Sequence, residues 1–89
     1  MDMQDIQAKL LALLTEIAPD VEPAAVDPAR NFRDQFDFDS MDTLHFAAAV
    51  SATFAIEVAE SDYQQLASLR SAGEFVQARL GVAVQTKGT

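Results

Sequence analysis

Apolar residues near the start of the chain recur at the spacing of one helix face. They follow one another at steps of three or four residues, with one adjacent pair, and are Ile6, Leu10, Leu13, Leu14 and Ile17. Asp2 and Asp5 stand where the helix dipole favours negative charge. Pro19 predicts the end of this helix, because the residue before a proline avoids helical geometry.

The following segment, Pro19 to Asp39, shows no sustained period and contains all three prolines of the chain. Only a short turn of helix, around Pro28 to Phe32, is expected in it. Connections of about 20 residues are usually functional or disordered. We expect an ordered loop, because apolar residues recur along it that can hold it to a core: Val21, Val26, Phe32, Phe36 and Phe38.

The second half of the chain predicts three more helices. The first runs from about Ser40 to Phe54 and has a broad apolar face. Ser61 with Gln64 resembles a capping box and predicts a short helix that carries Tyr63 and Leu66. A last helix is predicted to open with Ser71 and Glu74, to turn Ala72, Phe75, Val76 and Leu80 inward, and to stop at Gly81.

These elements predict an all-α fold, a small four-helix bundle with three main helices, a short third helix and a long loop between the first and second. Residues 1–82 form the bundle in this prediction, and residues 83–89 form a flexible tail. With 49% hydrophobic residues and no cysteine, the stability of the bundle must come from packing. No secretory signal or membrane span is recognisable, so we expect a cytoplasmic monomer.

The chain is strongly acidic, with 14 Asp and Glu against 6 Lys and Arg and a formal charge of −8. Eight of the acids lie between Glu16 and Asp42. This charge argues against nucleic acid and anionic membranes as partners. It favours partners with basic surfaces, or it serves only to keep a small domain soluble.

The stretch "FDFDSMDTLHF", Phe36 to Phe46, is the candidate site. As a calcium loop starting at Asp37 it fails, since Met41, Asp42 and Ala48 stand where an oxygen ligand, glycine and glutamate are needed. Hydrolysis fails as well, because Ser40 and His45 differ by five residues and lie ~140° apart around a helix. We therefore predict neither a metal site nor catalysis.

Two roles remain open for the serine at this point. Asp39 or Ser40 can cap the helix that starts here, by accepting a hydrogen bond from an amide of its first turn. Alternatively, Ser40 is a point of attachment, where a phosphodiester would sit at the positive end of the helix dipole.

The segments "FRDQFDFDSMDTLHF" and "FAIEVAESDYQQLASLRSAGEFV" resemble the acyl carrier proteins. The signature of that family reads approximately F-x-x-D-L-G-x-D-S-L. Phe32, Asp34, Asp39 and Ser40 match it, and Phe36 and Met41 are apolar replacements for leucines. The resemblance extends from the helix around Ile6 to Leu80.

The resemblance implies a carrier whose Ser40 receives 4′-phosphopantetheine from coenzyme A through a phosphopantetheinyl transferase. Acyl groups then ride on this arm as thioesters, and Asp39, Met41 and Asp42 are the implied partner-recognition residues. Further implied partners are acyl-activating, acyl-transferring or synthase enzymes with basic surfaces. Five residues would line an acyl pocket, unless they are plain core: Phe46, Val50, Val58, Tyr63 and Leu66.

Some positions depart from the family pattern. Asp37 replaces the usual glycine, and since aspartate tolerates left-handed geometry, we expect the turn to survive with some strain. His45 replaces a frequent glutamate, Ala59 a frequent proline, and "VSATF" lacks the usual acids. We interpret the chain as a specialised acyl carrier that serves fatty-acid, polyketide-like or other specialised lipid biosynthesis. The alternatives are an aminoacyl or peptidyl carrier and an unmodified helical interaction module.

Overall fold

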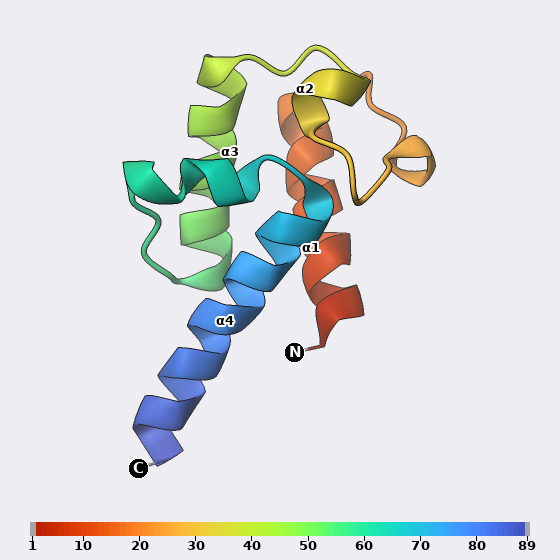
Figure 1. Cartoon of the computed structure of the whole chain (residues 1–89). Coiled ribbons are helices and arrows are strands. Elements are labelled where there is room, and N and C mark those ends of the chain that lie inside the picture. Colours follow the sequence, from red (N-terminus) through yellow and green to blue (C-terminus); the bar gives the residue numbers. More distant parts are fainter. Residues whose placement is uncertain (1, 89) are drawn as a thin grey trace.

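The computed structural model describes the backbone of residues 2–88 and the side chains of residues 2–81. Within these residues the chain is helical and has no strand. The elements, in chain order, are α1 (Met3–Ile17), the 3-10 helix η1 (Pro23–Ala25), α2 (Phe32–Gln35), α3 (Ser40–Phe54), the 3-10 helix η2 (Glu60–Leu66) and α4 (Leu69–Gly88). The predicted all-α bundle is confirmed: α1 packs against α3 and α4, and η2 packs against α3 and α4 (Figure 1).

Helix α1 has the bounds and the inward face that its pattern predicts. Asp2 caps it by accepting a hydrogen bond from the amide of Asp5 at 2.9 Å. Ile6, Leu10 and Leu14 are fully buried in the one core cluster, and Leu13 and Ile17 pack partly buried against it. The predicted span of Ser40 to Phe54 is likewise the span of α3.

The long connection is ordered and joined to the core, as expected. Phe32 lies at the centre of an aromatic cluster, with its ring centroid 5.7 Å from Phe36, 5.3 Å from Phe38 and 5.7 Å from Phe46. Val21 and Val26 pack partly buried against the same core. The helical turn predicted over Pro28 to Phe32 is misplaced, because α2 begins at Phe32 instead of ending there.

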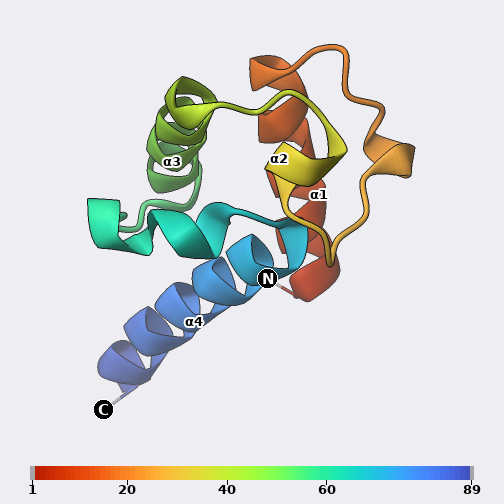
Figure 2. The ribbon, with the colours of Figure 1, turned by 45° about the horizontal axis from the view of Figure 1, so that its top comes forward.

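Two backbone hydrogen bonds tie this connection to the junction of η2 and α4. The amide of Phe32 donates to the carbonyl of Ala67 at 2.7 Å, and the amide of Arg70 donates to the carbonyl of Pro28 at 2.9 Å. Asn31 and Ser68 form an isolated antiparallel bridge between them. Figure 2 shows the loop around α2 reaching back across α1 to this junction.

The starts of the last two helices differ from the prediction. The amide of Ala59 is bound by the carboxylate of Asp62 at 3.0 Å, so η2 starts at Glu60 without the expected pairing of Ser61 and Gln64. Helix α4 starts at Leu69, and its cap is the Ser68 hydroxyl, which accepts from the amide of Ser71 at 3.2 Å. Ser71 is therefore inside the helix and does not cap it.

Gly81 does not stop α4, which continues to Gly88. A glycine ends a helix when it takes positive φ, and no described glycine does so. The flexible tail predicted for residues 83–89 lies outside the residues whose side chains are described, and both this tail and the 1–82 boundary stay predictions. In the described part of the chain, no helix combines the length and apolarity that crossing a lipid bilayer requires.

Candidate functional site

Ser40 is the first residue of α3 and is exposed. The cap of this helix is formed by its neighbours. Asp39 Oδ1 accepts from the amide of Asp42 at 2.9 Å, and Asp42 Oδ2 accepts from the amide of Asp39 at 3.1 Å. Because these two carboxylates complete a reciprocal capping box, the hydroxyl of Ser40 is not needed for it, and it forms no hydrogen bond to any described residue.

The backbone in front of Ser40 is anchored by aromatic side chains. Phe38 is buried, with 6% of its surface exposed, and Phe36 packs partly buried against the core. Asp37 between them points outward, as the alternation of the sequence requires. Left-handed geometry was expected at Asp37, but Ala55 is the one described non-glycine residue with positive φ, so Asp37 introduces no such strain.

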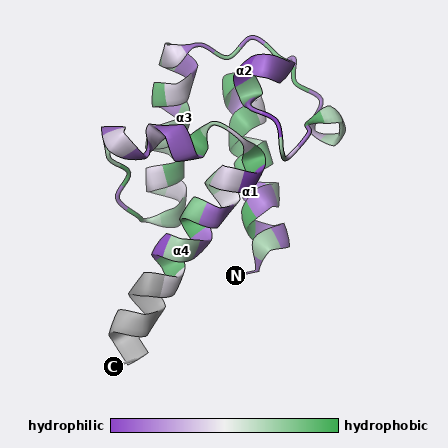
Figure 3. Cartoon of the chain, viewed as in Figure 1, coloured by the Kyte–Doolittle hydropathy of each residue, from purple (hydrophilic) through white to green (hydrophobic). Residues whose placement is uncertain are grey.

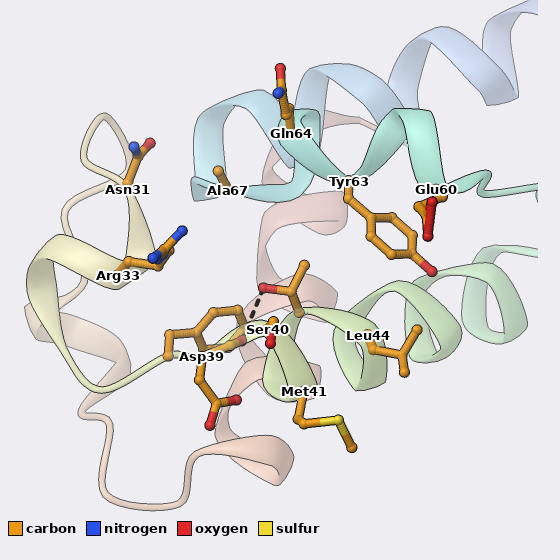
Figure 4. A pocket seen from close by; sticks show the side chains of 12 residues that line it. Asn31, Arg33, Asp39, Ser40, Met41, Leu44, Glu60, Tyr63, Gln64 and Ala67 are labelled. Carbon is orange, nitrogen blue, oxygen red and sulfur yellow. Dashed lines mark hydrogen bonds between the residues drawn. The ribbon is translucent and has the colours of Figure 1, made fainter.

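A groove opens beside the Ser40 side chain and has a volume of about 1020 Å³. Its walls are the first turns of α3, the helix η2 and the segment that leads into α2 (Figure 4). The lining combines apolar, amide and charged side chains: Asn31, Arg33, Phe38, Asp39, Ser40, Met41, Thr43, Leu44, Glu60, Tyr63, Gln64 and Ala67. The groove therefore offers a mixed surface that starts at the serine hydroxyl.

Two large apolar side chains are exposed at the rim of this groove. Met41 is 56% exposed and Leu44 is 45% exposed, and both belong to the face of α3 that carries Ser40. Asp42 is the one acidic residue in α3, and Figure 3 shows that the residues of this helix are less hydrophilic than those of α2 or η2. The α3 side of the groove is consequently apolar, with carboxylates at its edges.

The predicted acyl-pocket residues are divided by the structure. Phe46, Val50 and Leu66 are fully buried in the core, and Tyr63 lines the groove. Val58 lines a second, smaller hollow on the other side of η2, where Arg79 pairs with Asp62 at 3.4 Å. An acyl pocket formed by all five stays a prediction, since it would require the core to open.

The sequence reasoning missed several residues of the groove. Leu44 could have been found, because it belongs to the apolar stripe of the Ser40–Phe54 helix. Asn31, Arg33 and Gln64 carry no such signal, since they come from segments without a sustained period. Among the described residues, no group of three or more His, Asp and Glu side chains is arranged to hold a metal ion.

The serine and the groove fit a phosphopantetheine arm. The hydroxyl is accessible and unengaged, and the helix that holds it presents the positive end of its dipole to a phosphodiester. The arm itself contains amide groups joined by methylene units, which match the amide side chains of Asn31 and Gln64 and the rings of Phe38 and Tyr63. Such an arm would start at Ser40 and have a complementary surface directly beside it.

Comparison with known proteins bears on the same residues. The family model described as "Phosphopantetheine attachment site" matches residues 8–76. A meromycolate extension acyl carrier protein of Mycolicibacterium aurum is 30% identical over 73 residues, which cover 82% of this chain and 71% of that protein. The protein of the same description from Mycolicibacterium smegmatis is 31% identical over 77 residues, covering 83% and 75%.

Proposed function

Since the chain belongs to the acyl carrier proteins of the phosphopantetheine-attachment family, we propose that Ser40 carries its 4′-phosphopantetheine arm. The thiol at the end of the arm holds acyl groups as thioesters. Ser40 occupies the serine position of the family signature, and its accessible hydroxyl, free of any bond to a described residue, is the observation that carries this proposal. A serine used as a helix cap would have been engaged by the backbone.

The proposed cargo is an acyl intermediate of specialised lipid biosynthesis. Two relatives that match more than four fifths of this chain, 82% and 83%, are named for meromycolate extension. Their names support a dedicated pathway over a general one. The departures at Asp37 and His45 from the family pattern point the same way. The chain itself supplies the carrier and, in this proposal, catalyses no step.

The proposed partners are a phosphopantetheinyl transferase and the enzymes that load, extend and unload the arm. Met41 supplies an exposed apolar contact next to the attachment point. The carboxylates of Asp39 and Asp42 lie on either side of Met41 in the sequence and favour basic partner surfaces. Each carboxylate also accepts a hydrogen bond in the cap of α3. We propose the cytoplasm as the location, since coenzyme A and the acyl-handling enzymes must reach the serine there.

The test is modification of the purified protein. Incubation with coenzyme A and a broad-specificity phosphopantetheinyl transferase is expected to raise the intact mass by one phosphopantetheine. Ser40→Ala should show no gain, whereas Ser61→Ala, which changes an exposed serine outside the site, should gain the full group. Circular dichroism of both variants verifies that they are folded. If several transferases leave the wild-type mass unchanged, the attachment proposal is wrong.

A further inference from the structure

Among the residues whose side chains are described, Arg33 is the one cationic side chain that lines the groove beside Ser40. We infer that Arg33 binds the phosphodiester formed on Ser40, and that Asn31 and Gln64 hold the amides of the unloaded arm along the groove. This inference rests on the attachment proposed above. It assigns a phosphate-binding and arm-positioning role to the start of α2 and the residue before it, which the sequence pattern did not single out.

The charges around the groove create a need for this cation. Asp39 and Glu60 line the groove, and Asp37 and Asp42 lie close to Ser40 in the sequence. A phosphodiester adds a further negative charge to this region. An arginine is suited to balance it, because a guanidinium can form two parallel hydrogen bonds to phosphate oxygens.

Arg33 is also free to take this role. Arg79 is engaged by Asp62, and Arg30 Nη2 donates to the carbonyl of Asp34 at 3.0 Å. The guanidinium of Arg33 forms no hydrogen bond or ion pair with the described residues, and Figure 4 shows it extending from α2 into the groove. The side chain is exposed, so its charge can reach a phosphate in the groove without any rearrangement of the core.

The backbone that carries Arg33 is held firmly. Its neighbour Phe32 is fully buried and is bonded through its amide to Ala67. The side chain of Gln35 fixes the other end of α2, since its Oε1 accepts from the amide of Asp27 at 2.7 Å and its Nε2 donates to the carbonyls of Asp27 and Arg30 at 2.8 and 2.9 Å. Little ordering of the main chain is therefore needed when the phosphate binds.

The same bond between Phe32 and Ala67 fixes the spacing of the two amide side chains. Asn31 precedes Phe32 on one wall, and Gln64 stands on η2, one turn before Ala67, on the opposite wall. Both are exposed, and neither side chain forms a hydrogen bond to a described residue. They can therefore offer donors and acceptors to the two amides of the arm from opposite sides.

Nuclear magnetic resonance of the apo and modified protein tests the inference. Modification at Ser40 should move the backbone amide signals of residues 31–33 and 64–67 as well as those around residue 40. In Arg33→Gln the changes at 31–33 and 64–67 should largely disappear, and the phosphorus resonance should differ from that of the modified wild type. Arg33→Lys, which keeps the charge, should restore part of the changes.

Arg70→Gln is the matched control, because it removes an exposed arginine that does not line the groove. It should leave the changes on modification intact, and apo spectra of all variants show whether they are folded. If the wild-type protein gains the arm but the signals of residues 31–33 and 64–67 do not change, the arm does not bind along the groove and the inference is wrong. Changes that persist in Arg33→Gln overturn the role of Arg33. Absence of any mass gain would contradict the attachment instead.

Discussion

Ala55 ends α3 in the left-handed conformation, with φ 54° and ψ 47°. Its amide and that of Ile56 both donate to the carbonyl of Ser51, and the Ser51 hydroxyl donates to the carbonyl of Ile56 at 2.7 Å. This closure turns the chain toward η2. A residue with a Cβ takes up such a backbone at a cost of about 1 kcal/mol, because the Cβ crowds the following carbonyl oxygen.

Replacing Ala55 with glycine should therefore raise the free energy of unfolding by about 0.5 to 1 kcal/mol. Ala52→Gly, an exposed position inside the same helix, should lower it by a similar amount, because glycine there only loosens the helix. Urea denaturation of both variants measures the difference. Equal destabilisation by the two substitutions would mean that Ala55 does not adopt the left-handed conformation.

The sequence alone could not decide which side chain near Ser40 caps the helix. Asp39 and Ser40 were equal candidates for the cap, since both residue types accept hydrogen bonds from helical amides. The structure assigns the cap to Asp39 because its backbone is extended, with φ −95° and ψ −175°, while Ser40 is already within the helix. The hydrogen-bond partner of one oxygen thus depends on where the first helical residue falls, which periodicity leaves uncertain by a residue.

Among the helices, α1 and α3 followed directly from the periodicity of their apolar residues, whereas η2 and α4 started elsewhere than predicted. The segment from Ala59 to Glu74 offers several overlapping polar pairs at a spacing of three, including Ser61 with Gln64 and Ser71 with Glu74. The bridge between Asn31 and Ser68 holds the residue that caps α4, which favours a start at Leu69 over one at Ser71. A contact between residues so distant in the chain leaves no local signal.

The start of α4 supplies a stability test. Ser68 is buried, with 7% of the residue exposed, and its hydroxyl caps this helix, so Ser68→Ala should lower the free energy of unfolding by about 1 kcal/mol or somewhat more. Ser61→Ala removes an exposed serine that caps nothing and should change it by less than about 0.5 kcal/mol. Urea denaturation of both variants measures the two changes in the free energy of unfolding. A larger effect of Ser61→Ala would favour the sequence prediction that Ser61 caps the short helix.

The groove was the least predictable feature of the chain. Its walls combine the segment before α2, the first turns of α3 and the helix η2, which meet only after the long connection has folded back. The aromatic cluster around Phe32 drives that return, and the sequence did predict that these phenylalanines hold the loop to the core. It could not predict that Asn31 and Arg33, on either side of Phe32, would line the same groove as Ser40.

Charge governs how the entire protein meets its partners. With a formal charge of −8 on 89 residues, long-range attraction should speed its encounter with a basic transferase. The kcat/KM for modification of Ser40 should fall at least about tenfold between about 0.01 and 1 M salt, as the Debye length shrinks from about 30 Å to about 3 Å.

The internal control is kcat at saturating carrier, which should respond much less, because encounter no longer limits the rate. Initial rates at a series of salt concentrations give both quantities. A kcat/KM that does not change with salt would show that apolar contacts, such as those of Met41 and Leu44, guide the transferase without electrostatic steering.

The two bonds that join Phe32 to Ala67 and Arg70 to Pro28 also decide how the molecule can deform. They couple the wall that carries α2 to the end of η2 and to the start of α4, so we expect these segments to move together, while the first turns of α3 form a separate wall of the groove. Among the described residues, no backbone hydrogen bond joins the first turns of α3 to those segments, so we expect the groove to widen on the α3 side when a bulky group lies beside Tyr63. In the proposed carrier, the wall that bears the attachment point would then also be the wall that moves.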